Sequence, residues 1–422
     1  MRNSLLYFLT CYCFLYGIPG REIGIIPYGT IIEAVLLILW ITVLVTVPAE
    51  ERKSAGVDVV YLLIIWLGIS IAEVVNPGAS VAGWFFELRS AALYPCLIVP
   101  LGLIILRTHR HLDMFLILII ACSTLASLNG LKQLYIHPSP GEQRFLDGGG
   151  YITHILWGRL RVFSFYSDAG QFGASQAALG LSTLVLALGP YKKKTKLILL
   201  VCALLQLDGM LISGTRGALF ALVMGAFVAI ILTKNVKVLF IGGILLVGFI
   251  CFLKYTYIGN GNYQIYRLRT AVNPQDASLN VRFNTQMRMR EYMSTRPFGG
   301  GLGTIGAAGT QYNAGTYLST VQPDSYFVKI WAMYGVVGLT IWVSIMVYIL
   351  GKCFGIVWRI EDEGLKVKMV ALAAGCAGTL FCSYGNEVIN TMPSSIAVYL
   401  SWAVILGTPV IAASSKTNML IK

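Results

Sequence analysis

The sequence has little charge for its length. Asp, Glu, Lys and Arg make up 12% of 422 residues, whereas hydrophobic residues make up 56%. Soluble globular domains carry roughly 25% charged residues. With half that share and a mean hydropathy of +0.72, the chain cannot present a charged surface to water on all sides. The composition therefore excludes an ordinary soluble domain and predicts an integral membrane protein.

The residues that usually bind metals are also few and scattered. The 9 cysteines include no CxxC pair and lie mostly singly in apolar stretches, and the 4 histidines all lie before residue 155. This pattern predicts neither a disulfide framework nor a metal site, and we expect no cofactor. The formal net charge of +13 would suggest nucleic acid in a soluble protein. In a membrane protein it raises the question of where the charges lie.

Long apolar runs define the expected architecture. They predict an all-α fold with about twelve transmembrane helices, in which residues 1–422 form a single polytopic membrane domain. The expected spans are 3–18, 29–48, 57–75, 89–106, 112–130, 168–189, 196–213, 217–233, 237–254, 324–350, 367–384 and 392–412. The connectors on one side are short and mostly rich in lysine, so the positive-inside rule places them and both termini in the cytoplasm.

Two connectors on the other side are long, 131–167 and 255–323. Loops of this length are usually functional or disordered, and their aromatic content favours folded, functional loops. We expect 255–323 to be a large, partly helical outer loop within the membrane domain. The sequence shows no internal repeat, which weakens a transporter interpretation because many transporters have paired halves.

The outer loop 255–323 is rich in arginine and poor in acids. Its arginines are Arg267, Arg269, Arg282, Arg288, Arg290 and Arg296. Arginine offers a planar fork that suits phosphate and carboxylate. One interpretation is a basic face that is solvated or paired with lipid headgroups. The other is a binding site for an anionic substrate.

Arg216 lies between two apolar spans, in the segment SGTRGA at 213–218. A charge at mid-membrane depth costs on the order of 2.5–3.5 kcal/mol, so it normally has a partner or a function. The alternative is that Arg216 snorkels to the outer interface. The neighbouring glycines would allow a ligand to approach the backbone closely.

Four segments, in the right order, resemble the bacterial O-antigen polymerase and O-antigen ligase superfamily (Wzy and WaaL types). They are RVFSFYSDAGQFG at 161–173, SGTRGA at 213–218, SLNVR at 278–282 followed by RPFGGGLG at 296–303, and DSYF at 324–327 followed by YGVVGL at 334–339. The resemblance implies a GT-C-like glycosyltransferase in the bacterial inner membrane, with its active site at the periplasmic face.

The segments also depart from the family pattern. Ala169-Gly170 replaces a Pro-Asn pair, and Asp324 stands where ligases characteristically carry histidine. The change at Asp324 favours a polymerase of O-antigen or exopolysaccharide over an O-antigen ligase, which would transfer glycan to lipid A-core. From another class, a flippase or transporter of lipid-linked sugars would also need arginines, although on midplane helices rather than in an outer loop.

The resemblance implies metal-independent, inverting transfer from an undecaprenyl-diphosphate-linked glycan, with a chain-length regulator protein as a further partner. Fixed guanidinium groups would stabilise the diphosphate leaving group. We expect Arg216 and Arg282 in that role. Further candidates for substrate binding are Arg161, Arg288, Arg290, Arg296 and Glu387.

An attacking hydroxyl also needs a proton acceptor. Asp324 is the candidate base, with helix capping as its alternative role and Glu387 as the alternative acid. The glycine run 299–301 has neither the strand nor the Lys-Ser/Thr of a nucleotide loop. We expect it to turn the loop toward the membrane and to leave backbone N–H groups near the diphosphate.

Overall fold

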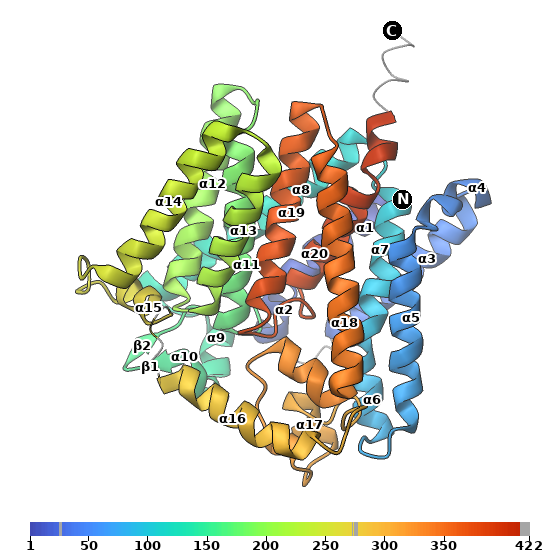
Figure 1. Ribbon diagram of the computed structural model, residues 1–422, viewed down its shortest axis with the longest axis vertical. Coiled ribbons are helices and arrows are strands. Elements are labelled where there is room, and N and C mark those ends of the chain that lie inside the picture. The colour runs from blue at the N-terminus through green and yellow to red at the C-terminus, as the bar shows by residue number, and fades with distance from the viewer. Residues whose placement is uncertain (25–27, 272, 274–276, 414–422) are drawn as a thin grey trace.

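The computed structural model describes residues 1–24, 28–271, 273 and 277–413, apart from the side chains of residues 28, 54, 277–279, 281 and 282. Helices account for nearly all of the regular structure (Figure 1). They are α1 (Arg2–Leu15), α2 (Gly17–Glu22), α3 (Tyr28–Thr46), α4 (Ala49–Arg52), α5 (Asp58–Ala72), α6 (Val81–Leu88), α7 (Tyr94–Ile105), α8 (His109–Tyr135), α9 (Pro140–Phe145), α10 (Tyr151–His154), α11 (Ala169–Ala187), α12 (Lys193–Ile212), α13 (Gly217–Thr233), α14 (Val236–Tyr255), α15 (Tyr263–Ala271), α16 (Ala277–Met293), α17 (Gly306–Tyr312), α18 (Tyr326–Trp358), α19 (Glu363–Cys382) and α20 (Ser394–Leu406).

Short helical turns and one hairpin complete the regular structure. The turns are η1 (Lys53–Ala55), η2 (Glu73–Val75), η3 (Arg89–Leu93), η4 (Leu146–Gly150) and η5 (Leu318–Thr320). Strands β1 (Ile155–Leu156) and β2 (Arg159–Leu160) pair antiparallel. Trp157 and Gly158 join them with positive φ angles of 52° and 72°, as a tight two-residue hairpin turn requires.

The all-α membrane fold is confirmed. Among the described residues, eight helical stretches are long and apolar enough to cross a membrane. They are α3, α5 with η2, the continuous stretch from α6 to α7, α8, α12, α14, α18 and α19. Helices α13 and α20 are apolar but shorter. The remaining expected spans, 3–18 and 168–189, coincide with α1 and α11, which do not meet this length and hydropathy criterion.

The start of one span differs markedly from the prediction. The expected span 89–106 begins eight residues earlier, because α6, η3 and α7 run on continuously from Val81 to Ile105. In the sequence, Glu87 and Arg89 interrupt the apolar run. The structure accommodates both charges: Arg89 pairs with Glu33 at 2.9 Å, and Glu87 pairs with Lys329 at 3.0 Å.

Helix α11 packs against α12, α13 and α19, and α13 also packs against α19. Helix α11 is buried along most of its length and is rich in Ala, Gly and Ser. Small residues let membrane helices approach closely. A Cβ on Gly225 of α13 would lie 2.9 Å from the carbonyl oxygen of Ala374, and one on Gly378 of α19 would lie 2.4 Å from that of Ala221. The low hydropathy of α11 therefore reflects its position inside the protein.

Helix α14 lies at the edge of the bundle (Figure 1) and exposes a large apolar surface. Only 6% of its membrane-length window is buried. Its exposed residues include Leu239, Phe240, Ile241 and Leu245. Such a surface is compatible with lipid and costly in water.

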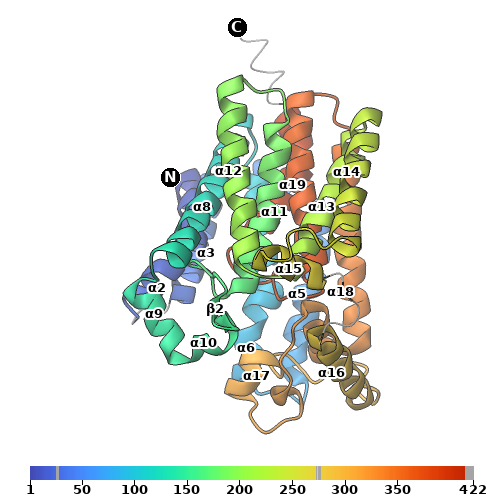
Figure 2. The same ribbon diagram turned by 90° about the vertical axis from the view of Figure 1, so that its left-hand side faces the viewer.

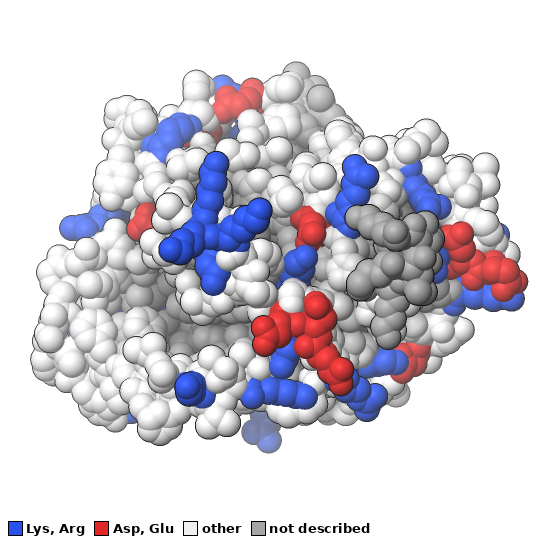
Figure 3. Space-filling view, turned by 90° about the horizontal axis from the view of Figure 1, so that it is seen from above, with Lys and Arg blue, Asp and Glu red and all other residues white. Residues whose placement is uncertain are grey.

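The two ends of the bundle differ. Helices α15, α16 and α17 of the outer loop lie at the lower end, where α16 crosses beneath the bundle (Figures 1 and 2). The opposite end bears the connector between α11 and α12 (Figure 2), and Lys and Arg side chains are spread across this face together with Asp and Glu (Figure 3). This separation agrees with the predicted topology; the assignment of that face to the cytoplasm stays a prediction.

Candidate functional site

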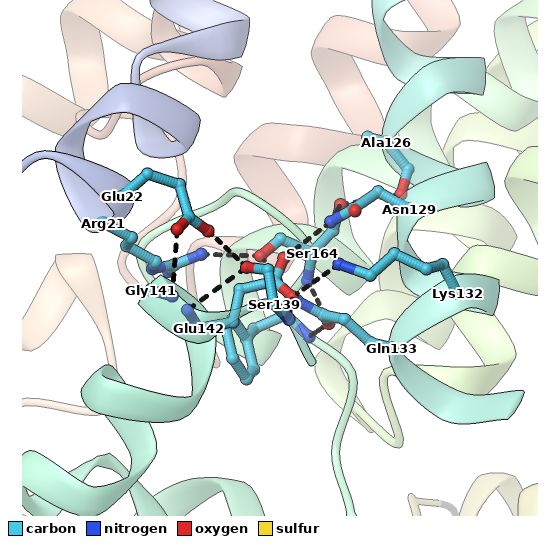
Figure 4. Close-up of polar contacts among 11 residues, drawn as sticks. Arg21, Glu22, Ala126, Asn129, Lys132, Gln133, Ser139, Gly141, Glu142 and Ser164 are labelled. Carbon is cyan, nitrogen blue, oxygen red and sulfur yellow. Dashed lines mark hydrogen bonds and ion pairs between the residues drawn. The ribbon is translucent and has the colours of Figure 1, made fainter. Parts of the chain in front are cut away.

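The segment 161–166, which carries Arg161, is held by a buried polar network (Figure 4). Ser164 has a φ of 51°, and its backbone N–H and carbonyl both bond to the side chain of Gln133 on α8, at 2.8 and 3.0 Å. The Ser164 hydroxyl donates to the carbonyl of Ala126 at 2.7 Å. These bonds fix the strained turn against α8, since buried backbone groups need partners.

A charged cluster from α2 and α9 closes over the same turn (Figure 4). Arg21 donates to the carbonyl of Ser164 at 2.6 Å and to that of Tyr166, and its guanidinium lies over the Phe163 ring at 4.6 Å. Burial lowers the pKa of Arg21. Glu142 pairs with Lys132 at 3.0 Å. Burial raises the pKa of Glu142, but its hydrogen bonds, led by that from Asn129, outweigh burial and lower the pKa overall.

The Gly214 turn between α12 and α13 gathers arginines from distant parts of the chain. A Cβ on Gly214 would lie 3.8 Å from Cγ of Arg161 and 3.9 Å from Nε of Arg267. Arg267 of α15 is buried and donates to the carbonyl of Gly214 at 3.2 Å. Arg161 donates to Oγ1 of Thr215 at 3.2 Å. Arg216 follows directly and is half-buried at the N-terminus of α13. Two guanidinium groups therefore bond to this turn, and Arg216 is near enough for its charge to lower the pKa of Arg161.

The cluster is electrostatically suited to an anion. Burial, followed by the positive charge of Arg267, lowers the pKa of Arg161, and Arg216 acts in the same direction. Asp168 opposes this effect, but its carboxylate already caps α11 by accepting from the N–H of Gln171 at 2.9 Å. Clustered guanidinium groups beside a helix N-terminus bind phosphate or carboxylate strongly. The arrangement would stabilise a diphosphate.

A second charged group consists of two carboxylates and the lysine between them, and we call it the carboxylate triad. It links α6, α18 and the connector between α19 and α20. Nζ of Lys329 lies 3.0 Å from Glu87 and 2.9 Å from Glu387. The Lys329 and Glu87 side chains are only 9% and 3% exposed. Burial, opposed by Lys329, raises the pKa of Glu387. Buried ionisable groups in membrane bundles are costly and usually functional.

The arginine cluster and the carboxylate triad are neighbours. Asn386, which precedes Glu387, lies against both arginine-bearing segments: its Nδ2 is 2.1 Å from the position of a Cβ on Gly217, and its Oδ1 is 3.3 Å from that on Gly170. Gln171 of α11 donates to the carbonyl of Glu387. The structure therefore places the connector that carries Glu387 beside the segments that carry Arg161 and Arg216; the roles of these residues stay predictions.

Residues 198–343 match the protein-family model Wzy_C, described as O-antigen ligase. The match supports the O-antigen ligase and polymerase superfamily. No match was found among curated proteins. The matched segment includes Arg216, Arg267 and Lys329, whereas Arg161, Glu87 and Glu387 lie outside it. Members of this family are glycosyltransferase-like O-antigen ligases and polymerases.

Within the matched segment, Asp324 does not cap α18. The capping residue is Ser325, whose hydroxyl accepts from the N–H of Val328 at 3.4 Å. The alternative role predicted for Asp324 is therefore wrong. Its side chain is exposed at the entrance to α18, and its role as base stays a prediction.

Of the other predicted arginines, those whose side chains the structure describes have contacts or exposure away from the cluster at Gly214. Arg288 and Arg290 are exposed on α16. Arg296 donates to the carbonyl of Tyr292 at 2.9 Å and lies over the ring of the same residue. Arg282 is on α16, and its side chain lies outside the described part of the chain. Their roles in binding stay predictions.

The glycine run does not offer all of its N–H groups to a ligand. Gly300 and Gly301 donate to the carbonyls of Ala332 and Met333 of α18, at 2.8 and 3.0 Å. Gly335, with a φ of 68°, kinks α18 there, and a Cβ on it would lie 2.0 Å from the carbonyl oxygen of Pro297. The N–H of Gly299 donates to the carbonyl of Arg296 at 3.0 Å. The expectation of backbone groups facing a diphosphate is therefore wrong for all three glycines, because their N–H groups bond within the loop or to α18.

Sequence reasoning missed three residues of the site: Arg267, Lys329 and Glu87. Arg267 was one of several loop arginines, and spacing could not distinguish it. Lys329 and Glu87 could have been recognised as candidates from the sequence, since each is a charge at the edge of an apolar run. Lys329 and Glu87 are more than two hundred positions apart, so the sequence could not show that they pair with each other.

Proposed function

We propose that this protein polymerises oligosaccharide repeat units carried on undecaprenyl diphosphate, by metal-independent inverting transfer at the outer face of the bacterial inner membrane. The observation that carries the proposal is the cluster of Arg161, Arg216 and Arg267 beside a buried carboxylate triad. A diphosphate leaving group needs positive charge close by, and three fixed guanidinium groups supply it. The predicted outer location rests on the opposite placement of the lysine-rich connectors.

The proposed reaction forms one bond and breaks one. The acceptor hydroxyl oxygen bonds to the anomeric carbon of the donor glycan, on the face opposite the diphosphate. The bond from that carbon to the diphosphate oxygen breaks, and the leaving group takes the electron pair. Arg161, Arg216 and Arg267 would hold the growing negative charge, while the hydroxyl proton passes to a carboxylate. Asp324, at the position of the ligases' histidine, is the candidate from the resemblance.

An O-antigen ligase is the second candidate, because the matched family model bears that description. The chemistry at the donor is the same, and only the acceptor differs. Asp324 in place of histidine favours the polymerase. The predicted chain-length regulator would act on polymer length and is not needed for the bond-forming step.

Reconstitution distinguishes these functions. The purified protein in vesicles with EDTA receives lipid-diphosphate-linked repeat units as its only substrate, and products are separated on a gel. We expect a ladder that grows by whole repeats and is lost in Arg216→Ala. Transfer that occurs only after lipid A-core is added would instead indicate a ligase. Movement of the lipid across the bilayer without either product would indicate a transporter and refute the proposal.

A further inference from the structure

Glu387 is the place where the four family-like segments meet. Gln171 of the first segment donates to its carbonyl. Gly217 of the second packs against the preceding residue, Asn386. Gly306, three residues beyond the third, would place a Cβ 3.9 Å from Oε1 of Glu387. Lys329, two residues beyond the DSYF motif of the fourth, pairs with Oε2 at 2.9 Å.

The backbone around Glu387 is held firmly. The Glu387 carbonyl also accepts from Oγ1 of Thr391 at 3.1 Å, and the N–H of Ile389 donates to the hydroxyl of Ser383 at 3.2 Å. The Tyr399 hydroxyl of α20 donates to the carbonyl of Ile389 at 3.1 Å. Because these hydrogen bonds fix the connector, a reacting group on it is positioned before substrate binds.

Within the triad, only Glu387 is accessible to a substrate. Its side chain is 26% exposed, against 3% for Glu87. Lys329 holds Oε2, and Gly306 lies next to Oε1, where the absence of a side chain leaves room. Glu87 is buried and serves as the counter-ion that keeps Lys329 in place.

We propose that the Glu387 carboxylate, oriented by Lys329, accepts the proton of the acceptor hydroxyl during glycosyl transfer. This inference rests on the proposed function and identifies its base. As the hydroxyl oxygen bonds to the anomeric carbon, the O–H bond breaks and its proton moves to Oε1. The neutral acid then returns the proton to water. No other reactant is required.

The neighbouring acids are less well placed. Asp168 uses one carboxylate oxygen to cap α11 and accepts from the hydroxyl of Ser167 at 3.0 Å with the other. Asp324 is exposed to water, whereas the Glu387 carboxylate is held by Lys329 at 2.9 Å. Burial and Glu87 raise the pKa of Glu387 whereas Lys329 lowers it. A base works best when its pKa approaches the operating pH.

The titratable groups around Glu387 are Lys329 and Tyr326 on α18 and Glu87 on α6, with a hydrogen bond from Asn390. Replacing Glu87 with glutamine removes a negative neighbour, which favours the ionised form of Glu387. The acid limb of the pH–rate profile should therefore move to lower pH. A merely structural role of the triad predicts no such movement.

The test compares Glu387→Gln, Glu387→Asp and Glu291→Gln in vesicles, with Glu291 as an exposed acid on α16. Initial rates of ladder formation and binding of undecaprenyl diphosphate are measured for each. We expect Glu387→Gln to lose at least about 100-fold in rate, as removal of a general base does, and to keep diphosphate binding. Glu387→Asp should recover part of the rate, and Glu291→Gln should match the wild type.

Three results would overturn the inference. The first is an active wild type whose rate changes less than threefold in Glu387→Gln, which would leave the proposed function intact. The second is an acid limb that stays in place in Glu87→Gln and disappears in Asp324→Asn, which would assign the base to Asp324. The third is a wild type that forms no product from either acceptor, which would refute the proposed function together with its base.

Discussion

Replacing Gln133 with leucine would leave two buried N–H groups without their acceptor. The Gln133 side chain is 3% exposed. Its Oε1 accepts from the N–H of Phe163 at 3.3 Å and from that of Ser164 at 2.8 Å. The carbonyl of Ser164 also loses the Gln133 amide but keeps Arg21 at 2.6 Å, so it remains satisfied.

The magnitude follows from those two donors. A buried polar group left unsatisfied costs about 1–3 kcal/mol, so the free energy of unfolding should fall by about 2–6 kcal/mol in Gln133→Leu. The same turn positions Arg161. We therefore expect weaker binding of undecaprenyl diphosphate as well as lower stability.

The assay is reversible unfolding in mixed detergent micelles, with Gln143→Leu as the matched control. Gln143 is exposed on α9 and bonds to Asp147 at 2.8 Å. An exposed substitution of this kind usually changes the unfolding free energy by no more than about 0.5 kcal/mol. Equal unfolding free energies for the two variants would refute the structural role assigned to Gln133.

Three further predictions concern the cluster, the packing and pH. Arg161→Ala should weaken undecaprenyl diphosphate binding about 10- to 100-fold, as loss of one charge-assisted hydrogen bond does, while Arg359→Ala at the opposite end should leave it unchanged; equal effects would contradict the assignment. Gly378→Ala should destabilise the protein in the same micelles, since its Cβ would lie 2.4 Å from the backbone carbonyl oxygen of Ala221, whereas Gly351→Ala, with nothing within 4 Å, should be neutral or stabilising. Burial lowers the pKa of His154, so unfolding takes up a proton and stability should fall as the pH drops through about 6.5; His154→Gln should make this decline shallower, and an unchanged slope would contradict it.

Two glycine-containing segments were predicted to lie close to a ligand, and the structure places them differently. The turn SGTRGA was predicted to let a ligand approach its backbone, and that stays a prediction: Gly214, with a φ of 59°, lies beside the side chains of Arg161 and Arg267. The run at 299–301 was expected to face a ligand, but it fastens to the kink at Gly335. Glycine permits both outcomes, and only the neighbouring chain decides which occurs.

The charged residues show the same limit. Arg216 could be singled out because a charge beside two apolar spans is rare and costly. Arg267 could not be separated from the exposed Arg288, because the two differ only in burial. Nor could Ser325 be distinguished from Asp324 as the cap of α18, since both residue types are favoured there.

The sequence by itself determined that the protein is an all-helical membrane bundle. Apolar runs of span length fix helices in a medium that cannot solvate backbone groups, and this constraint acts locally. It also singled out Arg161, Arg216 and Glu387 as candidates, but not Arg267, Lys329 or Glu87. Only the tertiary structure decided which side chains meet. Arg161, Arg216 and Arg267 converge, and Glu387 joins Lys329 and Glu87, because helices distant in the chain pack side by side, and such contacts are not encoded in any local pattern.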